Sequence, residues 1–448
     1  MVLQKFIRAL NPVELLRRDF FIYIIIGLLC GGVAVIFHLS ILLVFDTLRA
    51  YQNQQTPWSM LALMVISPAI GGLFIGLIIQ YVEPRAAGGG IPQTKEAYWN
   101  NNGILTIKEA FWRFILTVIS IGSGGSLGRE GPTVHLCASV ASQVGQWLKL
   151  RKETFQLMIP VGMGAGLAAA FNTPLAAITF VIEEVLLHDY KAKAIGGIIF
   201  AAVTAAAVER IILGSNPVYV VHLLPFNIDW WMLICLPIGV LGGISAHIFV
   251  TGLLHSRIRF QNWQQCPNWG KPAVGGLAMG MTGTMIFVTT GHDGMFGLGY
   301  DDFTDTLSGN IFGITLIILF AGKIIATILS FSSGGSGGII APSLYIGMML
   351  GGSVGSLLVH SFDLSNNIVG GAALLGMGAF FAGAIRVPFT SVLLVYEMTG
   401  NYSLILPLMF GNMLAYNIAE RLRPTPLHEA LLIQNDIHLH YHSSSKKW

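Results

Sequence analysis

The sequence predicts an all-α polytopic membrane protein, a bundle of transmembrane helices that are partly broken. Of its 448 residues 54% are hydrophobic and 10% are charged, whereas soluble domains carry about 25% charged residues. Apolar runs at 20–48 and 59–82 are long enough to cross a bilayer. Many other runs fall short of the roughly 20 residues of a full span. Such short pieces, interrupted by Gly and Pro, predict helices that break inside the membrane around an enclosed site.

Composition also excludes other classes of protein. The net charge of +3 is too small to indicate a nucleic-acid partner. The four cysteines are scattered without CxxC spacing, so we expect packing residues rather than a disulfide framework. Neither GxSxG nor HExxH occurs, which argues against an intramembrane hydrolase. We expect no enzyme activity, no cofactor and no cleavable signal peptide, since the first 20 residues are charged and amphipathic.

The stretch Gly-Ser-Gly-Gly-Ser-Leu-Gly-Arg-Glu-Gly-Pro at 122–132 predicts a helix that starts at Arg129. Pro132 suits the first turn of a helix, where its missing N–H would be unpaired in any case. Helix starts carry partial positive charge and free N–H donors, which makes them anion sites. Glu130 is a carboxylate within an apolar region and is therefore a functional candidate. The alternative is that Glu130 only caps a helix.

A second copy of this pattern occurs at 332–342, where Ile340 falls at the position of Glu130. A duplicated unit follows, and glycine-interrupted segments in two halves point to a transport site near the membrane midplane. The other matched pairs are Gly128 and Gly338, Pro132 and Pro342, Gly162 and Gly376, Pro174 and Pro388, and Glu183 and Glu397.

Further elements follow in chain order. The N-terminal residues 1–19 are basic, which predicts a cytoplasmic N-terminus by the positive-inside rule. A third glycine-rich stretch at 85–92 predicts another helix that starts with a proline. The run 156–187 is interrupted near Pro174 and ends in Glu183-Glu184, shortly before a basic loop with Lys191. We therefore expect Glu184 toward the cytoplasmic side. The remaining apolar segments are 107–119, 129–148, 194–214, 229–254, 272–290, 310–331, 339–359, 367–383, 387–400 and 402–419.

These segments predict four regions. Residues 1–19 form a cytoplasmic amphipathic segment, and 20–214 form the first transmembrane repeat. Residues 215–420 form the second repeat, in which 255–271 are polar and interfacial. Residues 421–448 form a short cytoplasmic segment, too short for a folded domain.

Five motifs, taken in order and spacing, resemble the CLC family of chloride channels and chloride–proton antiporters, in its short prokaryotic form. The resemblance covers nearly the whole chain. It implies a homodimer in which each subunit is an inverted repeat of tilted, broken helices around its own anion pathway. The motifs are GGGIP at 88–92, GREGP at 128–132, FNTPLAAITFVIEE at 171–184, GGIIAP at 337–342 and RVPFTSVLLVYEMTG at 386–400.

The resemblance also implies roles for individual residues. Glu130 corresponds to the external gating glutamate, whose carboxylate occupies an anion site and leaves when protonated. Glu184 corresponds to the internal proton-transfer glutamate of the exchangers; the alternative is a salt-bridged interfacial carboxylate near Lys191. Glu183 is then structural. The anion-binding residues implied, mainly through backbone N–H groups, are Gly89, Gly90, Ile91, Arg129, Glu130, Ile339 and Ile340.

Two positions depart from the family pattern. The family usually has Ser where this chain has Gly89, and its hydroxyl donates to the central anion. A late tyrosine normally donates the other hydroxyl, and His428 takes its place here. An imidazole can donate an N–H bond to an anion, more strongly when protonated, and histidine titrates near neutral pH. We therefore expect weak central binding and an acid-stimulated flux that depends on His428.

The function indicated is exchange of chloride or a similar monovalent anion for protons. The alternative is a passive channel of the same fold. Glu184 argues against the channel, and the altered inner gate argues for it. The partners expected are the anion, protons, a lipid membrane and a second copy of the chain, and the location expected is the inner membrane with both termini cytoplasmic. His438, His440 and His442 alternate in the tail, but without other nearby ligands we expect no metal site.

Overall fold

The computed structural model describes residues 12–187, 192–214, 228–363, 365 and 367–440. Most of the predicted N-terminal segment, Lys191, the predicted start of the second repeat at 215 and His442 lie outside these residues. Over the described ranges the chain is helical, with an isolated bridge between Gly128 and Gly338 as its β-type pairing. The all-α prediction is confirmed.

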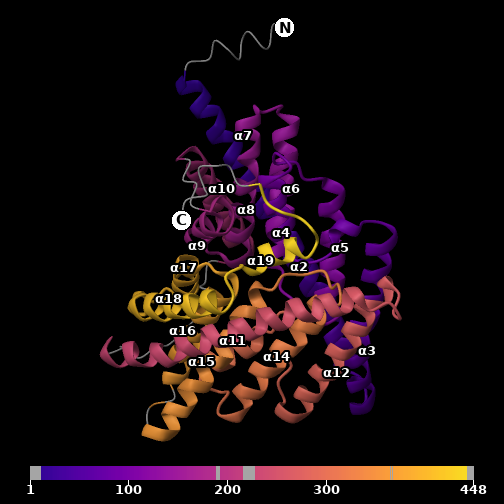
Figure 1. Cartoon of the computed structure of the whole chain (residues 1–448), viewed down its shortest axis with the longest axis vertical. Coiled ribbons are helices and arrows are strands. Elements are labelled where there is room, and N and C mark those ends of the chain that lie inside the picture. Colours follow the sequence, from indigo (N-terminus) through magenta and orange to yellow (C-terminus); the bar gives the residue numbers. More distant parts are fainter. Residues whose placement is uncertain (1–11, 188–191, 215–227, 364, 366, 441–448) are drawn as a thin grey trace.

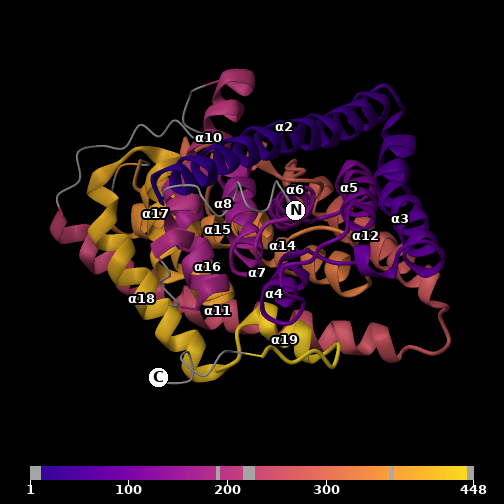
Figure 2. The same cartoon turned by 90° about the horizontal axis from the view of Figure 1, so that it is seen from above.

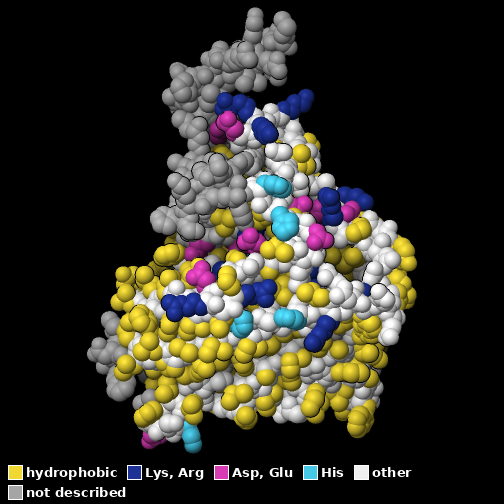
Figure 3. All heavy atoms as spheres, viewed as in Figure 1, with side chains coloured by type: hydrophobic (Ala, Val, Ile, Leu, Met, Phe, Trp, Pro, Cys, Tyr) yellow, Lys and Arg dark blue, Asp and Glu magenta, His cyan; other side chains and the backbone are white. Residues whose placement is uncertain are grey.

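Ten of the helices are long and apolar enough to cross a membrane. In Figure 3 hydrophobic side chains cover most of the lower half of the face shown, and charged side chains gather mainly above them. In chain order the described helices are α2 (Pro12–Asn53), α3 (Pro57–Tyr81), η1 (Pro84–Ala86), α4 (Ile91–Trp99), α5 (Ile107–Gly122), α6 (Glu130–Trp147), α7 (Lys152–Gln156), α8 (Met158–Phe171), α9 (Pro174–Phe180), η2 (Val181–Leu186), α10 (Ala192–Leu213), α11 (Ile228–Asn262), η3 (Asn268–Gly270), α12 (Lys271–Thr290), α13 (Tyr300–Leu307), α14 (Ile314–Ser332), α15 (Ile340–Phe362), α16 (Asn367–Ile385), α17 (Pro388–Thr399), η4 (Tyr402–Leu404), α18 (Ile405–Leu422) and α19 (Leu427–Ile433).

The predicted breaks occur where the Gly and Pro residues place them. Helix α4 begins at Ile91 with a proline in its first turn, and α6 begins at Glu130. Helix α8 ends at Asn172, whose left-handed φ of 56° stops the helix, and α9 starts at Pro174. Since proline supplies a fixed φ and lacks the N–H that a helix start leaves unpaired, these residues set the helix starts.

Three features differ from the predicted elements. Helix α11 continues to Asn262, past the predicted end at 254, and its Arg257 binds the side chains of Gln434 and Asn435. Helix α13 was not predicted, because eight residues with three aspartates are too short and too polar to form an apolar run. Residues after 421 contain the short helix α19, which packs against α4 in the interior (Figures 1 and 2).

The two halves of the chain meet at residues that the repeat makes equivalent. The Gly128 N–H donates to the Gly338 carbonyl at 2.7 Å, and the Gly338 N–H donates to the Gly128 carbonyl at 2.6 Å. Reciprocal contacts of this kind are what a two-fold relation between two similar units produces. The antiparallel sense of the bridge fits an inverted repeat.

The paired glutamates Glu183 and Glu397 make a second reciprocal contact. Glu183 accepts from the N–H groups of Phe389 and Thr390 at the start of α17, at 3.0 and 2.8 Å. Glu397 accepts from the N–H groups of Leu175 and Ala176 at the start of α9, at 3.0 and 2.8 Å. A carboxylate stabilises the positive end of a helix. Each half therefore caps a broken helix of the other, which agrees with the structural role expected for Glu183.

Candidate anion and proton site

The Glu130 carboxylate lies at the start of a helix from the other half of the chain. Glu130 is the first residue of α6, is fully buried, and its Oε2 accepts from the Ala341 N–H of α15 at 3.3 Å. Its Oε1 has no hydrogen-bond partner among the described residues. A Cβ added at Gly128 would lie 2.3 Å from Oε2, so glycine leaves the room that this carboxylate takes up.

This placement puts a negative charge where a helix start binds anions. The free N–H groups and the positive end of the α15 dipole attract any anion of suitable size. A carboxylate and a halide ion cannot occupy the same N–H groups together. An anion that approached this helix start would therefore have to displace the Glu130 carboxylate from the Ala341 N–H.

A small cavity lies among the other residues expected to bind the anion. Its volume is about 10 Å³, close to what one water molecule requires. Residues that are up to about 340 positions apart in the sequence meet here. For example, a Cβ added at Gly89 would lie 3.3 Å from the Gly337 carbonyl oxygen. The lining residues are Gly89, Ile91, Pro92, Phe331, Gly338, Ile339, His428 and Leu431.

The remaining predicted residues contribute backbone rather than side chains. Gly90 has a φ of +87°, and a Cβ there would approach the His135 Cβ to 2.7 Å, so only glycine fits. The Arg129 Nη2 donates to the Ala170 carbonyl at 2.8 Å, which ties its side chain to α8. Ile340 is buried as the first residue of α15 but does not line the small cavity.

Glu184 lies in η2, a single π-helical turn, and its carboxylate is buried in an ion-pair cluster. Its Oε1 accepts from the Lys95 Nζ at 2.9 Å, and the His428 Nδ1 lies 3.2 Å from the same oxygen. The side chains of Lys95 and Glu184 are 2% and 4% exposed. The cluster joins the residue expected to carry protons to a residue that lines the small cavity.

The salt bridge of Glu184 has a partner that was not predicted from the sequence. The carboxylate is buried within the protein and pairs with Lys95. Lys191 lies outside the described residues. A buried carboxylate needs such a partner because transfer of a lone charge out of water costs several kcal/mol.

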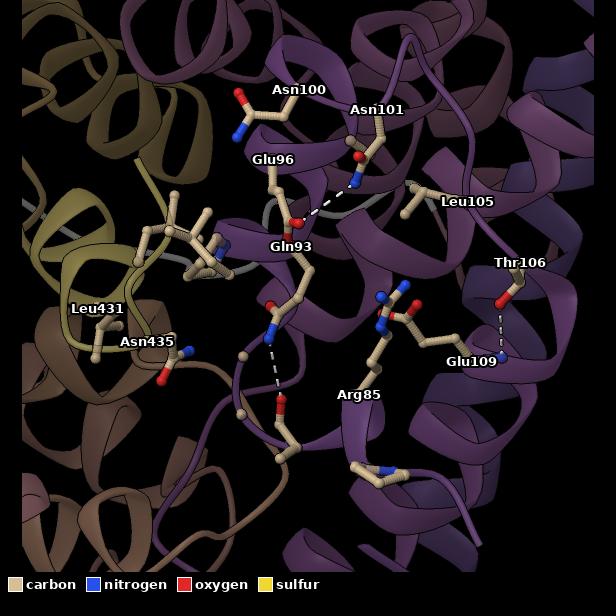
Figure 4. A pocket seen from close by; sticks show the side chains of 18 of the residues that line it. Arg85, Gln93, Glu96, Asn100, Asn101, Leu105, Thr106, Glu109, Leu431 and Asn435 are labelled. Carbon is tan, nitrogen blue, oxygen red and sulfur yellow. Dashed lines mark hydrogen bonds between the residues drawn. The ribbon is translucent and has the colours of Figure 1, made fainter. Parts of the chain in front are cut away.

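A much larger cavity, of about 740 Å³, shares part of its lining with the small one, and Figure 4 shows side chains that line the larger cavity. Both are lined by Gly89, Pro92, Phe331 and Leu431, so one layer of residues separates them. Figure 4 shows polar side chains around it, among them Gln93, which donates to the Ala87 carbonyl at 3.3 Å, and Glu96, which accepts from Asn101 at 3.3 Å.

Several buried charged residues beside this site were not predicted from the sequence. Arg113 is fully buried, and its guanidinium donates to the Ala87 and Gly88 carbonyls at 3.2 and 3.0 Å. Glu109 binds both Arg113 and His135, at 3.3 and 3.0 Å. A usable signal existed, because Arg113 is a charge within the apolar run 107–119 and Lys95 follows Ile91 by one helical turn.

Two of the tail histidines, His438 and His440, lie within the described residues, and His442 does not. Over the residues that the structure describes, no group of three or more His, Cys, Asp or Glu side chains could hold a metal ion. Asn100 binds the His438 carbonyl at 2.9 Å and the His440 N–H at 3.0 Å, which fixes the tail on the end of α4.

Ten apolar helices and paired broken helices, whose starts meet around buried carboxylates, define a polytopic membrane protein over the described residues. The family model described as voltage gated chloride channel matches residues 71–420. The H(+)/Cl(-) exchange transporter ClcA of Yersinia pestis bv. Antiqua (strain Angola) is 32% identical over 382 residues, which cover 84% of this chain and 78% of that protein. ClcA of Vibrio parahaemolyticus serotype O3:K6 is 32% identical over 425 residues, covering 92% of this chain and 89% of that protein.

The fold has a counterpart among solved structures. A slow cyanobacterial Cl⁻/H⁺ antiporter superposes with a TM-score of 0.79 at 24% identity, over 95% of this chain and 99% of that one. The chain belongs to the voltage gated chloride channel (CLC) family. The family and the inverted-repeat fold expected from the five motifs are confirmed.

Proposed function

We propose that this protein moves chloride, or a similar monovalent anion, across the membrane in exchange for protons, as a transporter and not as an enzyme. The observation that carries the proposal is the Glu130 carboxylate on the Ala341 N–H of α15, buried and with one oxygen unpaired. A group in this position serves both ions, since it leaves the anion site when it takes up a proton. The names of the relatives as H⁺/Cl⁻ exchangers support the same function.

The anion route in this proposal follows the two cavities. An anion enters the larger cavity from the cytoplasm, passes the layer at Gly89 and Leu431, and reaches the small cavity at Ile339. The backbone of Gly90, Ile91, Arg129, Ile339 and Ile340 offers helix-start N–H groups along the way. Glu130 closes the outer end.

Glu184 is the inner proton site in this proposal. It lies off the anion route, because His428 stands between it and the small cavity. A passive channel is the weaker candidate. The small cavity has room for about one water molecule, and Glu130 fills the outer site, so neither end is an open pore. No cofactor enters this scheme.

The experiment that tests the proposal is a measurement of reversal potential in proteoliposomes. Under a fixed chloride gradient, a pH gradient shifts the reversal potential of an exchanger and leaves that of a channel unchanged. Liposomes without protein give the background leak. A reversal potential that follows the chloride gradient alone, at every pH gradient, contradicts proton coupling.

A serine at position 89 is expected to tighten chloride binding. One hydrogen bond to a charged partner is worth about 1.5–3 kcal/mol, so the Gly89→Ser variant should bind chloride about tenfold or more tightly. The added Cβ would lie 3.3 Å from the Gly337 carbonyl oxygen, a contact that needs a small shift only. The same variant should discriminate chloride from nitrate better. Calorimetric titration with both anions measures this; unchanged affinity would show that position 89 does not face the anion.

We further propose that the protein is a homodimer in the inner membrane with both termini on the cytoplasmic side. The apolar exposed side chains of α9, α10, α17 and α18 support a dimer surface. Helices α10, α9, α17 and α18 pack in a row, Glu397 of α17 caps α9, and Glu183 of η2 caps α17. The C-terminal tail lies at the rim of the larger cavity, through which the anion is proposed to enter from the cytoplasm, and this supports a cytoplasmic C-terminus. The exposed residues are Leu175, Ile199, Phe200, Val203, Phe389, Leu406, Met409 and Phe410.

A further inference from the structure

Two buried ionisable side chains, those of Lys95 and His428, converge on one oxygen atom of a third, Oε1 of Glu184. Lys95 comes from α4, whose first residues line the small cavity, and His428 comes from the first turn of α19. All three side chains are nearly inaccessible to solvent, with His428 3% exposed. A buried cluster of this kind is stable only when its charges balance.

The Lys95 ammonium and the Glu184 carboxylate already balance one another when His428 is neutral. The ring of His428 then donates from Nδ1 to Glu184. Its Nε2 has no hydrogen bond to any described residue, and the ring lines the small cavity with Gly89 and Ile339. Nε2 is therefore the ring atom left for an occupant of that cavity.

An anion in the cavity would change this balance. Neutral imidazole presents a lone pair at Nε2, which an anion avoids, whereas imidazolium presents an N–H donor there. The positive charge of Lys95 opposes protonation of His428, and a bound chloride offsets it. The other charged residues on α19 and on the helices packed against it include Glu429 beside His428, Glu96 of α4, which accepts from Asn101, and Arg257 of α11, which binds Gln434 and Asn435; α16 has no titratable residue.

We propose that His428 takes up a proton at Nε2 together with each anion that enters the small cavity, so that anion and proton bind there cooperatively. The proton comes from water and leaves to water when the anion departs; Nδ1–H stays on Glu184 throughout. Lys95 is a positioning residue, because it keeps His428 neutral until the anion arrives. This proposal rests on the proposed function, and it adds a second proton-binding group that depends on the bound anion, besides Glu130.

The test counts protons taken up per chloride bound. Chloride titrations by calorimetry in two buffers of different ionisation heat give this number directly. The background variant is Glu130→Gln, because Glu130 itself takes up a proton when an anion displaces it. Between about pH 6 and about pH 8, the histidine range, we expect proton uptake and a chloride affinity that falls with pH, by up to about tenfold per unit for one linked proton.

Two substitutions remove the titratable imidazole of His428 and keep part of the shape of the side chain. Asn keeps a donor near the Nδ1 position and Gln keeps an amide near the Nε2 position, and neither takes up a proton in this range. In the Glu130→Gln background, both His428→Asn and His428→Gln should bind chloride with no proton uptake and with an affinity independent of pH. Proton uptake that persists in either variant overturns the proposal.

Lys95→Met gives an independent check, because it should favour the protonated ring of His428, whereas the His428 variants prevent protonation. Without the ammonium, the Glu184 carboxylate holds His428 protonated, so chloride should bind tightly up to alkaline pH and without proton uptake. Chloride binding that still weakens with pH in Lys95→Met contradicts the role of Lys95. Absence of proton uptake in the Glu130→Gln background, with intact chloride binding, also overturns the proposal. The reversal potential of the unsubstituted protein tests exchange separately, so the two failures are distinguishable.

Discussion

Replacing Glu130 with Gln is expected to abolish chloride-driven proton movement. The amide has nearly the shape of the protonated carboxylic acid but cannot take up or release a proton. The side chain is fully buried, so no water-exposed group can take its place at the start of α15. Proton uptake into proteoliposomes, driven by a chloride gradient and measured with an extravesicular pH electrode, should fall to the level of protein-free vesicles.

The Glu130→Ala variant is the matched control, because it removes the competing group altogether. Anion flux should become passive, and chloride affinity should rise about tenfold or more if the carboxylate is held by a bond of about 1.5–3 kcal/mol. Glu183→Gln is a second control, since its carboxylate caps α17 and lies outside the anion route. If Glu130→Gln still takes up protons under a chloride gradient at the rate of the unsubstituted protein, Glu130 is not the gating residue.

The helix starts of this fold could be predicted from sequence because local rules determine them. Pro92, Pro132 and Pro174 each stand in the first turn of the helix that the sequence predicts. The repeat between residues 128 and 338 added a tertiary expectation, since equivalent residues of an inverted repeat lie near a common axis. Their mutual hydrogen bonds are the clearest result of that duplication.

The charge cluster at Glu184 could not be predicted in the same way. Lys95 is 89 residues from its partner and His428 is 244 residues away. No periodicity within one segment reports such a pairing, because the burial of each residue depends on how α4, η2 and α19 pack. The sequence does carry one hint, a lysine directly after a glycine-rich helix start in an apolar region. A charge at such a position needs a buried partner of opposite sign.

Helix α13 was missed for a different reason. Its three aspartates and short length resemble a loop, and only tertiary contacts show its role. Asp302 is buried there, where it accepts from the Tyr345 hydroxyl at 2.5 Å and lies 3.2 Å from the His292 Nδ1. Phe303 and Leu307 do share one buried face of α13, but two apolar residues in a helix of eight are too few to distinguish it from a loop in the sequence.

Replacing Glu184 with Gln is expected to stop proton transport and to leave anion flux running. The carboxylate lies behind His428, away from the cavity that Gly89 and Ile339 line, so its loss does not close the anion route. The single substitution also leaves the Lys95 ammonium buried without a counter-ion, which costs about 3–5 kcal/mol. A lower thermal midpoint in detergent is therefore expected along with the loss of proton transport.

The double variant Glu184→Gln/Lys95→Met separates the two effects. It removes both charges of the ion pair, so stability should recover most of what the single variant loses. Proton transport should remain absent, because the carboxylate proposed to exchange protons with the cytoplasm is gone, while the proton on His428 enters and leaves only with the anion. Chloride efflux and proton uptake, recorded together on the same proteoliposomes, measure both quantities. If the double variant regains proton uptake with its stability, then Glu184 serves only to neutralise Lys95 and the inner proton site lies elsewhere.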